Sequence, residues 1–157
     1  GVGYVLYHQA QYDAALKTYQ EALEIKKEKL GSKHPQTATT MNNMALVLKS
    51  LGQDNEALEL YQEALEIEKE KLGPQHPLTA ITMDNMASLL ESQGDCDAAL
   101  ELYQEALEIK KEKLGPRHPS TATSMNNMAL VLKLQGEYDA ALELYQQALD
   151  IYKEKLG

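Results

Sequence analysis

The sequence predicts an all-α fold, built as a stack of antiparallel helix hairpins. Three series of residues carry this prediction, because each recurs at an interval of 42 along the chain. They are the His-Pro pairs at His34, His76 and His118, the glycines Gly52, Gly94 and Gly136, and the Lys-Leu-Gly ends at Gly31, Gly73, Gly115 and Gly157. Self-similarity at a fixed period of this size indicates a repeat architecture. The abundant Ala, Leu, Glu, Lys and Gln all favour helices.

The repeats divide the chain into one partial and three complete units. The complete units share about two-thirds of their residues with one another. The partial unit lacks the start of its first helix, and the chain opens without Met, so we expect it to be a piece of a longer protein. We expect one array over 1–157, with a truncated repeat at 1–31 and full repeats at 32–73, 74–115 and 116–157.

The first helix of each unit is marked at both ends. Pro35 suits a first helical turn, where its missing N–H is no loss, and Gly52 suits a helix end in the left-handed conformation. Between them, apolar residues recur at spacings of three and four, which places them on one helix face. They are Ala38, Met41, Met44, Ala45 and Leu48.

The second helix of each unit carries a wide apolar stripe, which predicts packing on two sides. Asn55, replaced by an aspartate in the other units, is a candidate N-cap. Ala45, Ala57 and Ala64 recur in every complete unit, as expected where two helices cross closely. We also expect the recurrent methionines and tyrosines to lie in the core. They are Met41, Met44, Met83, Met86, Met125, Met128, Tyr19, Tyr61, Tyr103 and Tyr145.

Charge and composition exclude several classes of partner. The formal charge of −9 argues against nucleic acid and against an anionic membrane surface, since both attract basic proteins. No apolar run reaches the roughly 18 residues that a membrane-spanning helix needs. The lone Cys96 allows neither an internal disulfide nor a multi-cysteine metal site, and we expect a cytoplasmic protein with Cys96 filling a turn position.

The recurrent histidines do not form a metal site in this arrangement. Zinc ligands lie about 2.0–2.1 Å from one ion, whereas equivalent positions in stacked hairpins are separated by roughly 8–10 Å. We therefore assign His34, His76 and His118 to a structural role at the hairpin junctions. The chain has no phosphate-binding loop, nucleophile elbow or metalloprotease motif. We expect no cofactor and no enzymatic activity.

The unit resembles the tetratricopeptide repeat, whose usual length is about 34 residues. The resemblance rests on the order Ala45, Gly52, Ala57, Tyr61 and Ala64. The longer period and the Leu-Gly-x-x-His-Pro junction are similar to the 42-residue version of kinesin light chains, as is the string Met41-Asn42-Asn43-Met44-Ala45. This resemblance implies a right-handed superhelical α-solenoid whose first helices line a concave groove that binds protein.

Transferred position by position, the resemblance implies a set of groove residues. The groove residues are Thr39, Asn42, Asn43, Leu46, Lys49 and Ser50 in the first complete unit, Ile81, Asp84, Asn85, Ser88, Glu91 and Ser92 in the second, and Thr123, Asn126, Asn127, Leu130, Lys133 and Leu134 in the third, with Tyr4, Tyr7 and His8 from the partial unit. Asn43, Asn85 and Asn127 make the strongest physical case. A primary amide offers two donors and an acceptor, and so can bind the backbone of an extended peptide whatever its sequence.

Two functions from different classes are consistent with these features. The first is a non-catalytic scaffold that binds an extended peptide or a helix in its groove. The second is an architectural spacer or self-associating segment, because the repeats are nearly uniform and the last helix carries Leu142, Leu149 and Leu156 with no following helix to cover them. On this second view, end-to-end packing between copies is expected.

Overall fold

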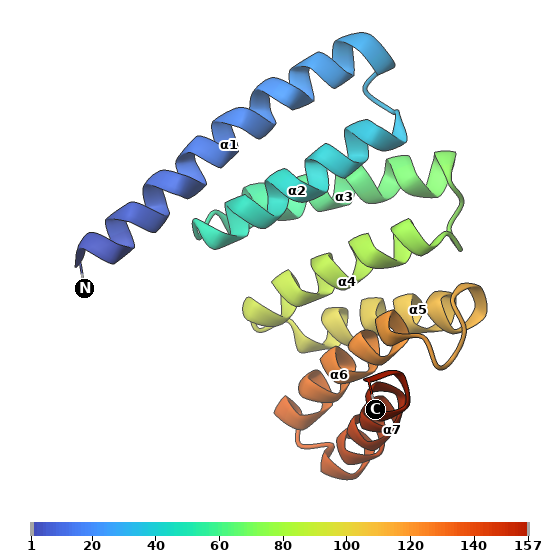
Figure 1. The fold of residues 1–157 in the computed structure, drawn as a ribbon. Coiled ribbons are helices and arrows are strands. Elements are labelled where there is room, and N and C mark those ends of the chain that lie inside the picture. The colour runs from blue at the N-terminus through green and yellow to red at the C-terminus, as the bar shows by residue number, and fades with distance from the viewer. Residues whose placement is uncertain (1, 157) are drawn as a thin grey trace. The chain divides into compact units, whose positions relative to one another are not determined.

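The structure, a computed structural model, describes the backbone of residues 2–156 and the side chains of residues 8–156. Within that range every regular element is a helix (Figure 1). The helices are α1 (Val2–Leu30), α2 (Pro35–Ser50), α3 (Asp54–Lys71), α4 (Pro77–Ser92), α5 (Cys96–Lys113), α6 (Pro119–Leu134) and α7 (Tyr138–Leu156). They form two units, Gly1–Gly73 and Pro74–Gly157, and the chain passes from one to the other at a predicted repeat boundary.

Each His-Pro pair begins a first helix. The histidine is the N-cap, and its Nδ1 accepts a hydrogen bond from the backbone N–H two residues later. The N···N distance is 3.1 Å from Gln36 to His34, and 3.0 Å for His76 and His118. The proline follows at the first helical position, where no donor is lost. The predicted structural role of these histidines is therefore confirmed, and it is helix capping.

A glycine ends each of these helices. Gly52, Gly94 and Gly136 have φ of 79°, 86° and 83°, a conformation that strains any residue with a side chain. The next helix begins two residues after the glycine, which is earlier than the sequence suggests. Asn55 consequently lies inside α3, and its prediction as the N-cap is wrong. In α5 the cap is Asp95, which accepts from the Ala98 N–H at 3.3 Å.

The first unit departs from the expected hairpin. Residues 2–30 form one uninterrupted helix, α1, instead of a helix end, a turn and a second helix (Figure 1). The reason lies at Ala10, which occupies the position of Gly52, Gly94 and Gly136 in the other repeats. Alanine strongly disfavours the left-handed conformation that the turn requires and is the best helix former. The helix therefore continues through the place where the other repeats turn.

The core of each unit lies where small residues let helices approach. The alanines equivalent to Ala45, Ala57 and Ala64 are buried in every complete repeat. In unit 1, Ala38, Met41, Ala64 and Ile67 pack together with Leu23 of α1. In unit 2 the equivalent cluster joins Leu107 of α5 to residues of α6 and α7, which are Ala122, Met125, Ala148 and Ile151.

The recurrent methionines and tyrosines lie beside these helix crossings, in or at the edge of the core. Met41, Met83 and Met125 are buried, and Met44, Met86 and Met128 are half-buried beside them. Tyr61 and Tyr103 are buried, whereas Tyr19 and Tyr145 are only half-buried. The core assignment is therefore confirmed for the five buried residues and holds only in part for the half-buried methionines and for Tyr19 and Tyr145.

Replacing the turn glycine tests the turn chemistry. A Cβ at Gly136 would meet no atom within 4 Å, so the Gly136→Ala substitution acts only through backbone strain. We expect it to lower the free energy of unfolding by about 1–2 kcal/mol, measured by urea denaturation. Gly136→Asn should cost less, because asparagine tolerates this conformation. Equal costs for the two variants would contradict the explanation.

Candidate functional site

The candidate binding surface is the face of each first helix that does not pack into a core. In unit 2, α4 and α6 contact each other directly and place Asn85 and Asn127 at equivalent positions. In unit 1, α2 carries Asn43 at the same position. Asn43 is exposed, and the other two are half-exposed. Among the described residues these three amides form no hydrogen bond, so their donors and acceptors are available to a ligand.

Apolar side chains accompany these amides. Leu46 and Leu130 lie one turn after Asn43 and Asn127, and both are exposed. Ile81, one turn before Asn85, and Leu134, at the end of α6, are also exposed. Each first helix therefore presents a primary amide next to an aliphatic side chain, a combination that can contact both the backbone and the side chains of a peptide.

On α2 and α4, the residue that precedes the asparagine contacts the second helix of its own hairpin. Asp84 is expected among the binding residues, whereas the structure buries it between α4, α5 and α6. The Lys110 ammonium donates to Asp84 Oδ2 at 2.5 Å and to Ser124 Oγ at 2.9 Å, and Ser124 donates to the same carboxylate oxygen at 2.8 Å. Asp84 therefore belongs to an internal ion pair.

Unit 1 has a different pair at the same two positions. Asn42 Nδ2 donates to Glu68 Oε1 at 3.1 Å, and Glu68 is buried. Asn126, the third equivalent, is half-buried. The candidate surface thus keeps Asn43, Asn85 and Asn127, while Asn42 serves packing between helices.

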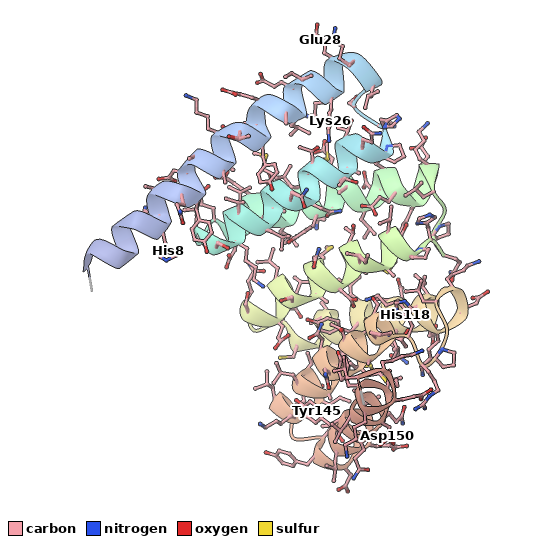
Figure 2. The ribbon with its side chains drawn as sticks, in the orientation of Figure 1. His8, Lys26, Glu28, His118, Tyr145 and Asp150 are labelled. Carbon is pink, nitrogen blue, oxygen red and sulfur yellow. The ribbon has the colours of Figure 1, made fainter. Side chains whose placement is uncertain are left out.

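The same polar layer joins a second helix to the next first helix. In unit 1, Lys26 extends from α1 toward α2 and donates to Thr40 Oγ1 at 2.7 Å (Figure 2). Lys26 and Lys110 are equivalent residues, as are Thr40 and Ser124. Comparing the sequence at intervals of 42 gives a signal for this layer, because Asn42 is replaced by Asp84 where Glu68 is replaced by Lys110.

Burial dominates the electrostatics of Asp84. Desolvation raises the pKa of its carboxyl, and the Lys110 charge and the hydrogen bonds from Lys110 and Ser124 oppose that effect. The outcome is a carboxyl whose pKa remains above its ordinary value. Such a group is tolerated because its cation and a hydroxyl lie within hydrogen-bonding distance.

The remaining predicted residues divide between the surface and the core edge. Lys133 is exposed and Lys49 is half-buried. Ser88 hydrogen-bonds with Tyr103, whose hydroxyl also donates to Glu91 Oε2 at 3.3 Å. Ser88 and Glu91 therefore help satisfy the buried Tyr103 hydroxyl. His8 is half-buried, and the side chains of Tyr4 and Tyr7 lie outside the described residues.

The described part of the chain presents no candidate metal site. It contains no group of three or more His, Cys, Asp or Glu side chains placed to hold a metal ion. Over the same residues, none of the helices combines the length and the apolar character needed to cross a bilayer.

Comparison with known families decides the classification. The sequence profile of the tetratricopeptide repeat matches residues 1–70, 43–112 and 94–154. The chain belongs to the tetratricopeptide repeat family. Repeats of this family generally mediate protein–protein interaction and are typically non-catalytic. No curated protein matches the sequence significantly.

Solved structures place these repeats near kinesin light chains. BtubC (BKLC) from P. vanneervenii is 28% identical with a TM-score of 0.86, over 94% of this chain and 59% of that one. A structure of a putative kinesin light chain with nearly identical TPR-like repeats, from Podosopora anserina, is 25% identical with a TM-score of 0.77, over 93% and 69%. The all-α, kinesin-light-chain-like repeat fold is thereby confirmed.

A charge deletion tests the internal ion pair. Lys110→Met leaves a buried carboxylate without its cation, and we expect a loss of about 3–5 kcal/mol in the free energy of unfolding at pH 7. Because the pKa of Asp84 is already raised, protonation should relieve this loss as the pH falls. Urea denaturation at pH 7 and near pH 4 measures both effects.

The neighbouring repeat supplies a matched control. The double variant Asp84→Asn/Lys110→Glu recreates the pair of Asn42 and Glu68. We expect it to recover most of the stability lost in Lys110→Met, since an amide donor again faces a buried carboxylate. If the double variant is as unstable as Lys110→Met, the two pairs are not interchangeable as described.

Proposed function

We propose that the exposed face of the first helices binds a segment of a partner protein in extended conformation. The observation that carries the proposal is the pair of half-exposed amides on the adjacent helices α4 and α6. Asn85 and Asn127 have no hydrogen bond among the described residues. An amide of this kind can donate to a peptide carbonyl and accept from a peptide N–H at once.

Apolar contacts supply the second part of the proposed recognition. Ile81, Leu130 and Leu134 are exposed on the same helices as the two amides. Aliphatic side chains of the bound segment would cover them, and each such residue would gain from the removal of apolar surface from water. Asn43 and Leu46 repeat the combination on α2.

Charge has a minor part in this proposal. With Asp84 paired internally, the face in unit 2 retains exposed Lys133 and half-buried Glu91. These opposite charges leave the face near neutrality. Binding should therefore depend only weakly on ionic strength, in contrast to recognition of a strongly acidic or basic segment.

A peptide library measures the proposed activity directly. The wild-type chain and the triple variant Asn43→Ala/Asn85→Ala/Asn127→Ala would be screened in parallel, with affinities of selected peptides from fluorescence anisotropy. Each hydrogen bond contributes about 0.5–1.5 kcal/mol, and a peptide held by Asn85 and Asn127 of unit 2 would lose two of them. The triple variant should therefore bind such a peptide at least about fivefold more weakly.

A second variant controls for loss of surface amides in general. Gln146 and Gln147 are exposed on α7, and Gln146→Ala/Gln147→Ala should leave the peptide affinity unchanged. Equal affinity of the wild type and the triple variant would reject recognition by these asparagines. A screen that selects no peptide would favour the architectural role, for which the exposed leucines of α7 are the supporting observation.

A further inference from the structure

The last helix carries an apolar stripe at alternating spacings of four and three residues. Its members are Tyr138, Leu142, Tyr145, Leu149, Tyr152 and Leu156. Tyr138, Leu142, Leu149 and Leu156 are 66%, 57%, 51% and 85% exposed, and Tyr145 (Figure 2) and Tyr152 are half-buried. We call these six residues the α7 stripe. Six large apolar or aromatic side chains aligned on one helix exceed what scattered surface residues explain.

The repeat symmetry shows what covers this face elsewhere in the chain. Leu107 of α5 is equivalent to Leu149, yet it is 5% exposed because it packs against Ala122 and Met125 of α6. In unit 1 the equivalent Leu23 of α1 packs in the same way against Ala38 and Met41 of α2. The same face of a second helix therefore receives a first helix in both described units.

The α7 stripe is more apolar than its buried counterpart. Tyr138 occupies the position of Cys96, and Tyr152 that of the charged Lys110. The Tyr152 hydroxyl lies 2.9 Å from Thr123 Oγ1 within its own hairpin, so the polar end of this side chain is already satisfied. A solvent-facing end of a repeat array normally becomes more polar. Here Tyr152 replaces a charged lysine and Tyr138 adds a large aromatic side chain, which favours an occupied surface.

We infer that the α7 stripe is a docking surface for an amphipathic helix of the α6 kind. Such a helix would carry alanine and methionine at the spacing of Ala122 and Met125, so that Leu149 could insert beside them as Leu107 does in α5. The partner needs no hydroxyl opposite position 152, because Tyr152 replaces the lysine that donates to Ser124 of α6. This inference is independent of peptide binding by α4 and α6.

A synthetic peptide with the sequence of residues 117–135 provides the probe. We expect saturable binding of the labelled peptide to the full chain, followed by fluorescence anisotropy, with a gain in helical circular dichroism. The variant Leu142→Glu/Leu149→Glu should bind at least about tenfold more weakly, since two large apolar side chains are lost from the interface. Both leucines are exposed, so these changes do not disturb the core.

Leu78→Glu is the matched control, because Leu78 is also an exposed leucine but belongs neither to the α7 stripe nor to the proposed peptide-binding residues. Unchanged binding in this variant supports the assignment. Weaker binding in Leu130→Glu, a change on the first-helix face, with full binding in the α7 variant would overturn it in favour of the α4 and α6 surface. A wild-type dimer in light scattering that Leu149→Glu dissociates, without peptide binding, would overturn it in favour of a second copy of the chain.

Attaching the helix covalently distinguishes a docking site that binds the free peptide weakly from the absence of a docking site. Appending a copy of residues 116–134 after Gly157 places the added helix as α6 is placed after Gly115. We expect a higher Tm than for the parent chain and loss of that gain in Leu142→Glu/Leu149→Glu. No rise in Tm and no added helical signal would contradict the docking surface.

Discussion

The close approach of paired helices at alanine is the constraint on which the rest of each unit depends. Alanines equivalent to Ala45, Ala57 and Ala64 are buried in all three complete repeats, and helix axes separated by roughly 8–10 Å leave little space for larger side chains. Larger residues then fill the space beside the crossings, as Met41 and Ile67 do in unit 1. This packing turns one face of each first helix toward the core. The opposite face, which carries Asn43 or Asn85, therefore lies at the surface.

The His-Pro caps and the glycine turns preserve this geometry at the two ends of each hairpin. His76 caps α4 at one end, and Gly94 allows the turn into α5 at the other. Where the glycine is replaced by Ala10, the turn disappears and α1 continues as one helix. Repeats of similar sequence can therefore differ in architecture through a single backbone requirement. The surface asparagines lie outside both the crossings and the caps, so neither the packing nor the capping accounts for their recurrence.

The period, the helix faces and the core residues could be predicted from the sequence because they depend on local spacing. The burial of Asp84 is not a local property, since its neighbour Asn85 is also polar, and the only sequence signal is the complementary change from Glu68 to Lys110 at the position 26 residues further along. The continuity of α1 departs from the turn that the other units predict, and the sequence signal for it is Ala10 in place of their turn glycine. The prediction that Asn55 caps α3 is wrong because the helix already begins at Asp54, directly after the glycine turn.

The substitution Ala106→Leu tests the central constraint most directly, with Ala140→Leu as its control. Ala106 is fully buried, and Ala140 is exposed on α7. Measured by urea denaturation, Ala106→Leu should lower the free energy of unfolding by about 1–3 kcal/mol through overpacking. Ala140→Leu should change it by no more than about 0.5 kcal/mol. Equal stability of the Ala106→Leu variant and the wild type would contradict the claim that close packing at alanine determines this structure.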